Sequence, residues 1–202
     1  MQKTILSFWL CLSLAMIHRA HAQQNVGEPA FGLKGGLNIS SISSSGGQIN
    51  SAAVGFHAGA YITTMLSDKI GIQPELVYSQ QGYRISSANF YNGTGGYNVH
   101  YNYLYLPVIV KIYVSDGANI QLGPQFGYLL SSNETIFTPS TPRKLDAGVA
   151  LGIGYETDGG LNFTLRYNRG FINVAPSTYA IGQSQASTNQ VFQLSVGYTF
   201  GQ

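Results

Sequence analysis

The feature that most constrains the fold of this chain is a regular alternation between long and short connections. Eight segments show period-two alternation of apolar and other residues: 31–40, 54–66, 70–83, 99–114, 120–131, 145–156, 161–170 and 192–200. Four of the connections between them are long and polar: 41–53, 84–98, 132–144 and 171–190. Three are short and rich in turn-forming residues: 67–69, 115–119 and 157–160. Because long and short alternate strictly, the pattern predicts eight antiparallel strands in up-and-down order, with both chain ends on the short-turn side.

The alternation within each segment predicts two chemically different faces. In the last segment, the apolar side chains are Phe192, Leu194, Val196, Tyr198 and Phe200, and the residues between them are Gln193, Ser195, Gly197 and Thr199. Successive side chains of a strand point to opposite faces of the sheet. Most segments also reach the roughly 9–11 residues that a tilted strand needs to cross a membrane. An apolar face toward lipid and a polar face toward a narrow lumen would satisfy both observations.

Composition decides whether the apolar face meets lipid or lines a soluble core. Charged residues make up 9% of the chain, against about 25% in ordinary soluble domains. Disorder does not explain this, because apolar residues make up 44%. A soluble eight-stranded barrel of the lipocalin kind is the competing fold, but its outer face would need many solvated charges. We therefore predict an all-β fold, an eight-stranded antiparallel up-and-down transmembrane β-barrel of the outer-membrane type.

The first residues have the features of a cleaved signal peptide. Lys3 precedes a short apolar run at 5–17, and Ala20-His21-Ala22 has the small-x-small pattern of a cleavage site. We expect a signal peptide at 1–22 and a barrel domain at 23–202. Without Lys3 and Arg19, eight basic residues balance eight acidic ones, and no basic patch suggests nucleic acid as a partner. The single cysteine, Cys11, lies in the apolar run, so the barrel has neither disulfides nor cysteine metal ligands.

Isolated ionisable residues on the polar faces are the candidate functional residues. Because they come from different strands, we expect them to meet in the lumen as a polar network: Lys34, His57, Glu75, Lys111, Asp146 and Arg166. Buried charges need partners, so the simplest expectation is a network of ion pairs and hydrogen bonds that plugs the barrel. A gated path or a binding site for a small solute is the functional alternative.

Aromatic residues concentrate toward the ends of the segments. We expect one interfacial girdle on the long-connection side, made of Tyr78, Tyr83, Tyr101, Tyr128, Tyr167 and Phe171, and one on the short-turn side, made of Tyr155, Tyr198 and Phe200. The alternative is that tyrosine is simply a frequent strand residue.

Three prolines lie inside the predicted strands: Pro74, Pro107 and Pro124. Each removes a backbone hydrogen-bond donor from the sheet, and β-bulges at these positions are one explanation of how the strands accommodate them.

Four short motifs stand out along the chain: 32–38 (GLKGGLN), 73–82 (QPELVYSQQG), 103–107 (YLYLP) and 146–155 (DAGVALGIGY). In this order and spacing they resemble the PorT-like family of outer-membrane β-barrel domains. The resemblance covers essentially all of the chain after the signal peptide and implies an eight-stranded barrel in the bacterial outer membrane. It implies little about activity. The name-giving member is associated with a protein secretion apparatus, but none of these motifs is a secretion site.

The last strand resembles the terminal signal that the barrel assembly machinery recognises. Its relevant residues are Gln193, Ser195, Tyr198 and Phe200, and two further residues, Gly201 and Gln202, follow the aromatic end. The expected partners are therefore outer-membrane lipids and, during insertion, the assembly machinery. The sequence does not specify a partner for the long connections.

We expect a structural or interaction role, with both termini in the periplasm and with no catalytic site, cofactor or metal. A narrow transport or secretion-associated component is the first alternative. A lipid-modifying enzyme is the second, because small outer-membrane barrels can use a histidine, a serine and a carboxylate. His57 and His100 are the only histidines after the signal peptide, and no local motif selects a serine beside either of them.

Overall fold

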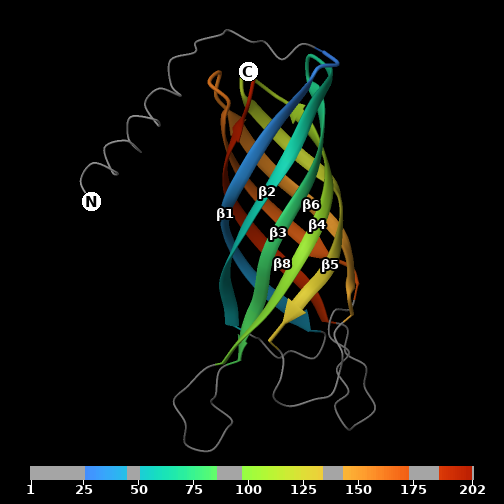
Figure 1. The fold of residues 1–202 in the computed structure, drawn as a ribbon, viewed down its shortest axis with the longest axis vertical. Coiled ribbons are helices and arrows are strands. Elements are labelled where there is room, and N and C mark those ends of the chain that lie inside the picture. The colour runs from blue at the N-terminus through green and yellow to red at the C-terminus, as the bar shows by residue number, and fades with distance from the viewer. Residues whose placement is uncertain (1–25, 45–50, 86–96, 134–142, 173–186, 202) are drawn as a thin grey trace, which may run out of the picture.

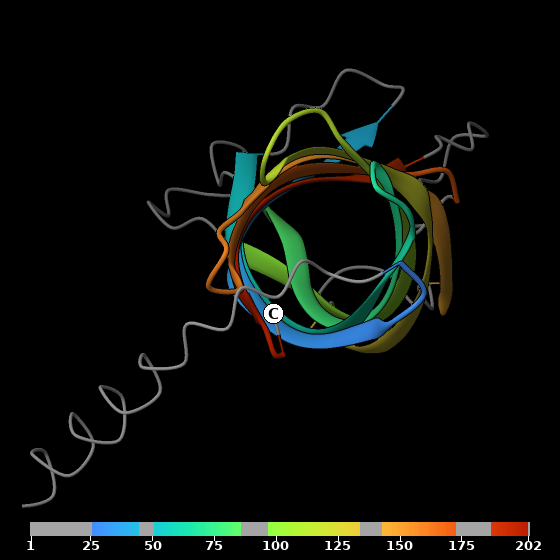
Figure 2. The same cartoon turned by 90° about the horizontal axis from the view of Figure 1, so that it is seen from above.

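Eight antiparallel strands form a closed barrel in the computed structural model, which describes residues 26–44, 51–85, 97–133, 143–172 and 187–201 (Figure 1). The strands are β1 (Pro29–Ser44), β2 (Ser51–Ser67), β3 (Ile70–Ile85), β4 (Tyr97–Tyr113), β5 (Ala118–Ser132), β6 (Leu145–Glu156), β7 (Leu161–Gly170) and β8 (Ser187–Thr199). Each strand pairs with the next, and β8 pairs with β1, so the ring seen along the barrel axis is complete (Figure 2). The predicted fold class is confirmed. The expected signal peptide and the middle of each long connection lie outside the described residues.

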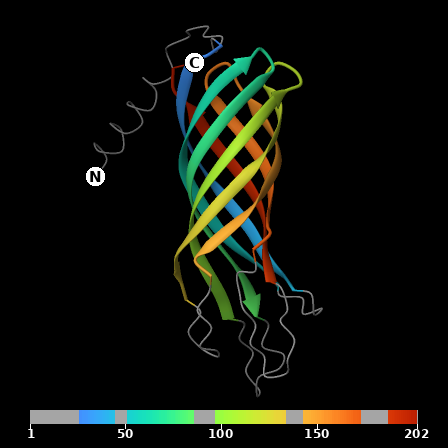
Figure 3. The same ribbon diagram turned by 90° about the vertical axis from the view of Figure 1, so that its right-hand side faces the viewer.

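The first and last strand ends lie beside the short turns. Pro29 and Thr199 are at the same end of the barrel as the turns 68–69, 114–117 and 157–160 (Figure 3). Gly117 and Gly160 have φ of 79° and 82° in two of these turns, a conformation that is unfavourable for residues with a Cβ. The turn sequences therefore support the up-and-down order directly.

Several strands extend further toward the long connections than the apolar pattern predicts. β4 begins at Tyr97 and β5 ends at Ser132, so both continue into polar sequence. The extension is longest at the seam, where β1 ends at Ser44 and β8 begins at Ser187 and these two residues pair, beyond the predicted limits at 40 and 192. Backbone pairing needs only N–H and C=O groups, whereas a hydrophobic pattern ends where the lipid ends. Apolar alternation therefore marks the membrane-spanning part of a strand and misses its polar extension.

The two predicted faces are present, with the apolar one outside. Phe31, Leu33, Leu37 and Ile39 of β1 are each about half exposed, whereas Asn38 between them is completely buried. The same outward apolar pattern covers the other strands. An apolar surface of this extent marks contact with a membrane or a partner. No helix in the described part of the chain is long and apolar enough to span a membrane.

The girdle prediction is wrong for two tyrosines. Tyr101 has no exposed surface and Tyr83 is half buried, and their rings pack against each other inside the barrel, 6.3 Å apart. Tyr101 shares its face of β4 with Lys111, and Tyr83 shares its face of β3 with Glu75. Whether a residue has an odd or an even position in the strand (its parity) therefore decides which face its side chain occupies, and its distance from the strand end does not. The remaining predicted girdle residues are outward and exposed or half exposed: Tyr78, Tyr128, Tyr155, Tyr167, Phe171, Tyr198 and Phe200.

The three strand prolines do not lie at bulges. Pro74 pairs with Val108, and Pro124 with Val149, and the pairing register is the same on both sides of each proline, Pro107 included. Shifts in register occur elsewhere, between Ala52 and His57 for example. Each proline removes a donor without displacing the strand.

Two neighbouring glycines of β1 allow a test of packing inside the barrel. A Cβ on Gly36 would lie 1.9 Å from the carbonyl oxygen of Leu194 and 2.9 Å from Cε1 of His57, whereas a Cβ on Gly35 would meet only the carbonyl of His57, at 3.6 Å. We expect Gly36→Ala to lower the free energy of unfolding by about 1–3 kcal/mol, as overpacking does, and Gly35→Ala to change it by less than about 0.5 kcal/mol.

This comparison is measured by urea unfolding in lipid vesicles, followed by circular dichroism, because the only tryptophan is Trp9 in the expected signal peptide. Equal effects of the two substitutions would contradict the close approach of β1 to β8.

Candidate functional site

The six ionisable residues expected in the lumen are all buried inside the barrel. Lys34, His57, Glu75, Lys111, Asp146 and Arg166 come from six different strands. Glu75, Lys111, Asp146 and Arg166 are each 3% exposed and His57 is 1% exposed, while the Lys34 side chain is 6% exposed. The structure does not join them in one network, however. It separates them into groups stacked along the barrel axis.

The central group is an ion-pair triad around Glu75. Arg166 donates to both carboxylate oxygens, from Nη1 at 3.0 Å and from Nη2 at 2.9 Å, and Lys34 Nζ pairs with Oε2. Gln73 Nε2 donates to Oε1 at 2.7 Å. A bidentate guanidinium–carboxylate pair is among the strongest polar contacts in proteins. Two cations thus share one carboxylate, and the triad carries an excess of one positive charge.

Neutral side chains extend the triad to neighbouring strands. Arg166 Nη2 also donates to Gln121 Oε1 at 2.7 Å, and Gln121 Nε2 donates to Asn119 Oδ1 at 2.9 Å. On the other side, Thr63 Oγ1 donates to Gln73 Oε1 at 2.7 Å. The charges are therefore embedded in a continuous set of amide and hydroxyl groups that spans the lumen.

Lys111 belongs to a second group nearer the short turns. It pairs with Glu156, the last residue of β6, which also accepts a hydrogen bond from Tyr113 OH at 2.8 Å. The Lys111 ammonium lies 5.8 Å from the centre of the Tyr61 ring, within cation–π distance. Glu156 was not among the predicted lumen residues. Glu156 occupies an even position of β6, as Asp146 does, and this alternation alone predicts that its side chain points into the lumen.

Asp146 lies in a third group and does not join the central triad. Its Oδ2 accepts hydrogen bonds from Tyr105 OH at 2.6 Å and from Asn189 Nδ2 at 3.2 Å. Its Oδ1 has no hydrogen-bond partner within the described residues. None of the three ion pairs found in that part of the chain includes Asp146.

His57 lies between Asn38 and Ser195 at the seam of the barrel. Its Nδ1 is 2.8 Å from Asn38 Oδ1, and its Nε2 is 2.8 Å from Ser195 Oγ. This order of groups is the one that serine hydrolases use, with a base between a hydroxyl and an orienting side chain. All three residues are nevertheless buried, with exposed fractions of 3% or less.

The residues of the expected assembly signal divide between the two faces of β8. Gln193 and Ser195 are buried, and Gln193 Nε2 donates to Asn38 Oδ1 at 3.1 Å. Tyr198 and Phe200 are outward, and the Phe200 ring stacks on Phe31 at 5.9 Å across the β1–β8 seam. The inward pair therefore helps to close the barrel.

A column of tyrosines fills the lumen toward the long connections. Tyr101, Tyr103 and Tyr105 occupy successive inward positions of β4, with ring centres 6.4 and 5.3 Å apart, and each is 3% exposed or less. Val77, Val99 and Leu129 pack with them in one buried cluster. The lumen prediction missed this column because it considered only ionisable residues, although the Tyr-x-Tyr-x-Tyr spacing places all three rings on one face.

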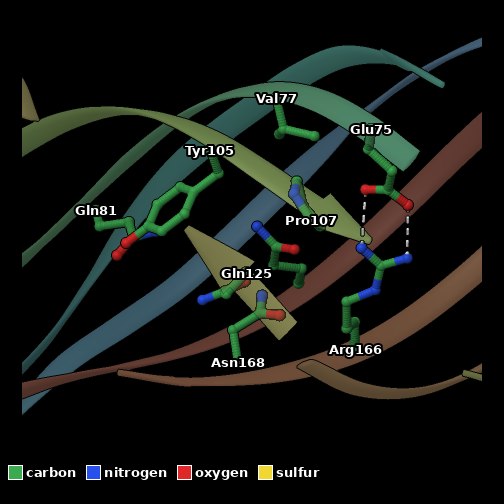
Figure 4. Close-up of a pocket in the computed structure, with 9 residues that line it drawn as sticks. Glu75, Val77, Gln81, Tyr105, Pro107, Gln125, Arg166 and Asn168 are labelled. Atoms are coloured by element: carbon green, nitrogen blue, oxygen red, sulfur yellow. Dashed lines mark hydrogen bonds and ion pairs between the residues drawn. The ribbon is translucent and has the colours of Figure 1, made fainter. Parts of the chain in front are cut away.

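Between the triad and the tyrosine column lies a small cavity. It encloses about 10 Å³, close to the minimum for a single water molecule. Glu75 and Arg166 border it on one side and Tyr105 and Gln81 on the other, with Pro107 and Gln125 between them (Figure 4). A space of this size cannot transmit a solute. The described residues also include no group of three or more histidine, cysteine, aspartate or glutamate side chains placed to bind a metal ion.

A closed eight-stranded barrel with an apolar exterior and an interior filled by polar and aromatic side chains is the architecture of an outer-membrane β-barrel protein. Residues 21–175 match the family described as "Outer membrane protein beta-barrel domain", and the chain belongs to that family. The family indicates the bacterial outer membrane as its location. No curated protein matches the chain in sequence.

Two solved structures have a similar fold. Neisserial surface protein A is 12% identical with a TM-score of 0.56, and the match covers 86% of this chain and 99% of that one. The outer-membrane protein OprG from Pseudomonas aeruginosa is 14% identical with a TM-score of 0.50, and the match covers 88% of this chain and 98% of that one. At these identities the likeness concerns the fold alone.

Proposed function

We propose that this protein is a plugged outer-membrane barrel with a structural or interaction role, which anchors its four long connections at the cell exterior and neither conducts solutes nor catalyses a reaction. The observation that carries this proposal is that side chains of the described residues fill the lumen, apart from one cavity of about 10 Å³. The Lys111–Glu156 pair, the Glu75 triad and the tyrosine column follow one another along the axis. The connections, rather than the lumen, then provide the surface available to a partner.

The proposed orientation places the short turns and both termini in the periplasm. It is supported by the usual asymmetry of such barrels, with short periplasmic turns and longer extracellular loops.

Residues 1–22 would direct export as a cleaved signal peptide. Gln193, Ser195, Tyr198 and Phe200 would be recognised by the assembly machinery before β8 pairs with β1, since two of these side chains are buried afterwards. Within the family, the four motifs favour the PorT-like group.

Transport or secretion through the lumen is the first alternative. A solute would have to separate Arg166 from Glu75, a bidentate contact between two side chains that are 3% exposed or less. Removing one partner of such a pair leaves the other charged and buried, at a cost of several kcal/mol. The contacts therefore favour a closed barrel.

Lipid hydrolysis at Ser195 is the second alternative, favoured by its contact with His57. The serine faces the lumen, while its chain neighbours Leu194 and Val196 are about half exposed on the lipid side. A lipid would need to cross the barrel wall to reach Oγ. We therefore assign the Asn38–His57–Ser195 group to the structural closure of the seam.

A planar-bilayer experiment tests the proposal. We expect the refolded barrel to produce no discrete single-channel current steps, because the ion-pair triad and the tyrosine column block the axis. Heat-modifiable gel mobility of the same sample verifies that the barrel is folded before it is added. A known open barrel of the same strand number, inserted under the same conditions, is the positive control.

Two results would overturn the proposal. Reproducible current steps would replace the plugged barrel with a transport component. Release of fatty acid from the bilayer lipid by the wild-type protein, abolished in a folded Ser195→Ala variant, would replace it with an enzyme.

A further inference from the structure

The exposed charges of the described residues are separated by sign between the two ends of the barrel. Every exposed ionised residue at the long-connection end is basic: Arg84, Arg143, Lys144 and Arg169. At the short-turn end the exposed acidic residues are Glu28, Asp68, Asp116 and Asp158, with Lys69 as the only basic one. In the sequence, the long connections outside the described residues add a single charged residue, Glu134.

This separation is a property of the outer surface alone. Among the residues that the structure describes, the lumen contains three basic and three acidic ones: Lys34, Lys111, Arg166, Glu75, Asp146 and Glu156. The interior is therefore balanced. After position 22 the chain has equal numbers of basic and acidic residues, yet its outer surface is positive at one end and negative at the other. A surface field of this kind attracts or repels charged groups at each end of the barrel.

The basic residues lie where the lipid-facing surface ends. Arg169 is exposed on the outward face of β7, between Tyr167 and Phe171 in the outward series. Lys144 immediately precedes Leu145, which is 64% exposed and pairs with Tyr128 of β5. Outward aromatic rings mark the headgroup level of a membrane. Lys144 and Arg169 are thus at the depth of lipid headgroups, rather than above the membrane.

We propose that Arg84, Arg143, Lys144 and Arg169 form a basic belt that binds the phosphate groups of anionic lipids in the leaflet around the long-connection end. Guanidinium groups bind phosphate oxygens in a bidentate manner, and lysine supplies a strong point charge. The four residues lie on β3, just before β6 and on β7, so they are on two sides of the barrel and do not converge on one pocket. A distributed belt that continues the lipid-facing surface fits many headgroups of a leaflet better than one soluble anion.

Spin-labelled lipids provide the test. The full-length folded barrel is reconstituted in phosphatidylcholine vesicles, and electron paramagnetic resonance measures how strongly labelled phosphatidylglycerol and labelled phosphatidylcholine associate with its boundary. We expect at least about a threefold preference for the anionic lipid at low salt, given the strength of basic residues near anionic headgroups. The preference should decrease as salt increases.

Matched variants locate the effect at one end. Replacing all four belt residues by glutamine should reduce the preference to about one, whereas Lys69→Gln at the other end should leave it unchanged. The double variant Arg143→Gln/Lys144→Gln, expected to show an intermediate preference, serves if the fourfold variant does not fold. The proposal is overturned if the wild type shows no preference, if the folded belt variants retain it, or if inorganic phosphate at equal charge concentration abolishes it, which would identify a soluble anion as the ligand.

Discussion

Glu75→Gln is expected to lower the free energy of unfolding of the barrel by about 3–5 kcal/mol, the usual cost of breaking a buried ion pair from one side. The substitution keeps the shape of the side chain but removes the charge that Arg166 and Lys34 share. Both cations would then remain in an interior where each is 6% exposed or less. Reversible urea unfolding in lipid vesicles measures the effect.

A double-mutant cycle separates the ion pair from general disruption. If the loss comes from unpaired charge, Glu75→Gln/Arg166→Gln should be clearly less destabilised than the sum of its two single variants, since the residues contact each other. The exposed Asp68→Asn is the matched control at a solvated position and should change stability by less than about 0.5 kcal/mol. An effect of Glu75→Gln no larger than that of Asp68→Asn would refute the buried triad.

Leu194→Arg is expected to cost about 2–4 kcal/mol because it places a charge on the lipid face near the middle of the membrane. Leu194 is 58% exposed and lies between Leu37 of β1 and Leu165 of β7, at mid-height of the closing seam. The cost of such a charge depends strongly on depth. Unfolding in vesicles, by the same procedure as for Glu75, provides the measurement.

Leu145→Arg is the matched control, with the same substitution at the rim. Leu145 begins β6 and follows Lys144, so the new guanidinium reaches the headgroup region, where the cost is about 0–1 kcal/mol. The neighbouring lumen position, Ser195, is a poor control because its hydroxyl contacts His57. Similar costs for Leu194→Arg and Leu145→Arg would mean that the height assigned to one of these positions is wrong.

The errors of sequence interpretation in this protein have a common origin. Tyr83 and Tyr101 were assigned to an outer girdle because they lie near strand ends, although their parity places them inside with Glu75 and Lys111. Glu156 was not predicted to enter the lumen, although its parity matches that of Asp146. In a strand, the direction of a side chain is set by alternation along the chain, and position along the strand sets only its height.

The sequence by itself determined the number of strands, their up-and-down order, which face meets lipid and most of the ionisable residues that enter the lumen. These properties are local, since they depend on residues two apart and on the lengths of the connections. Tertiary structure alone decided the partners: Arg166 with Glu75, 91 positions away in the chain, Lys111 with Glu156, and Asp146 with Tyr105. The physical reason is that the stagger between strands around the closed barrel sets the height at which each inward residue meets the others, and no single strand contains that stagger.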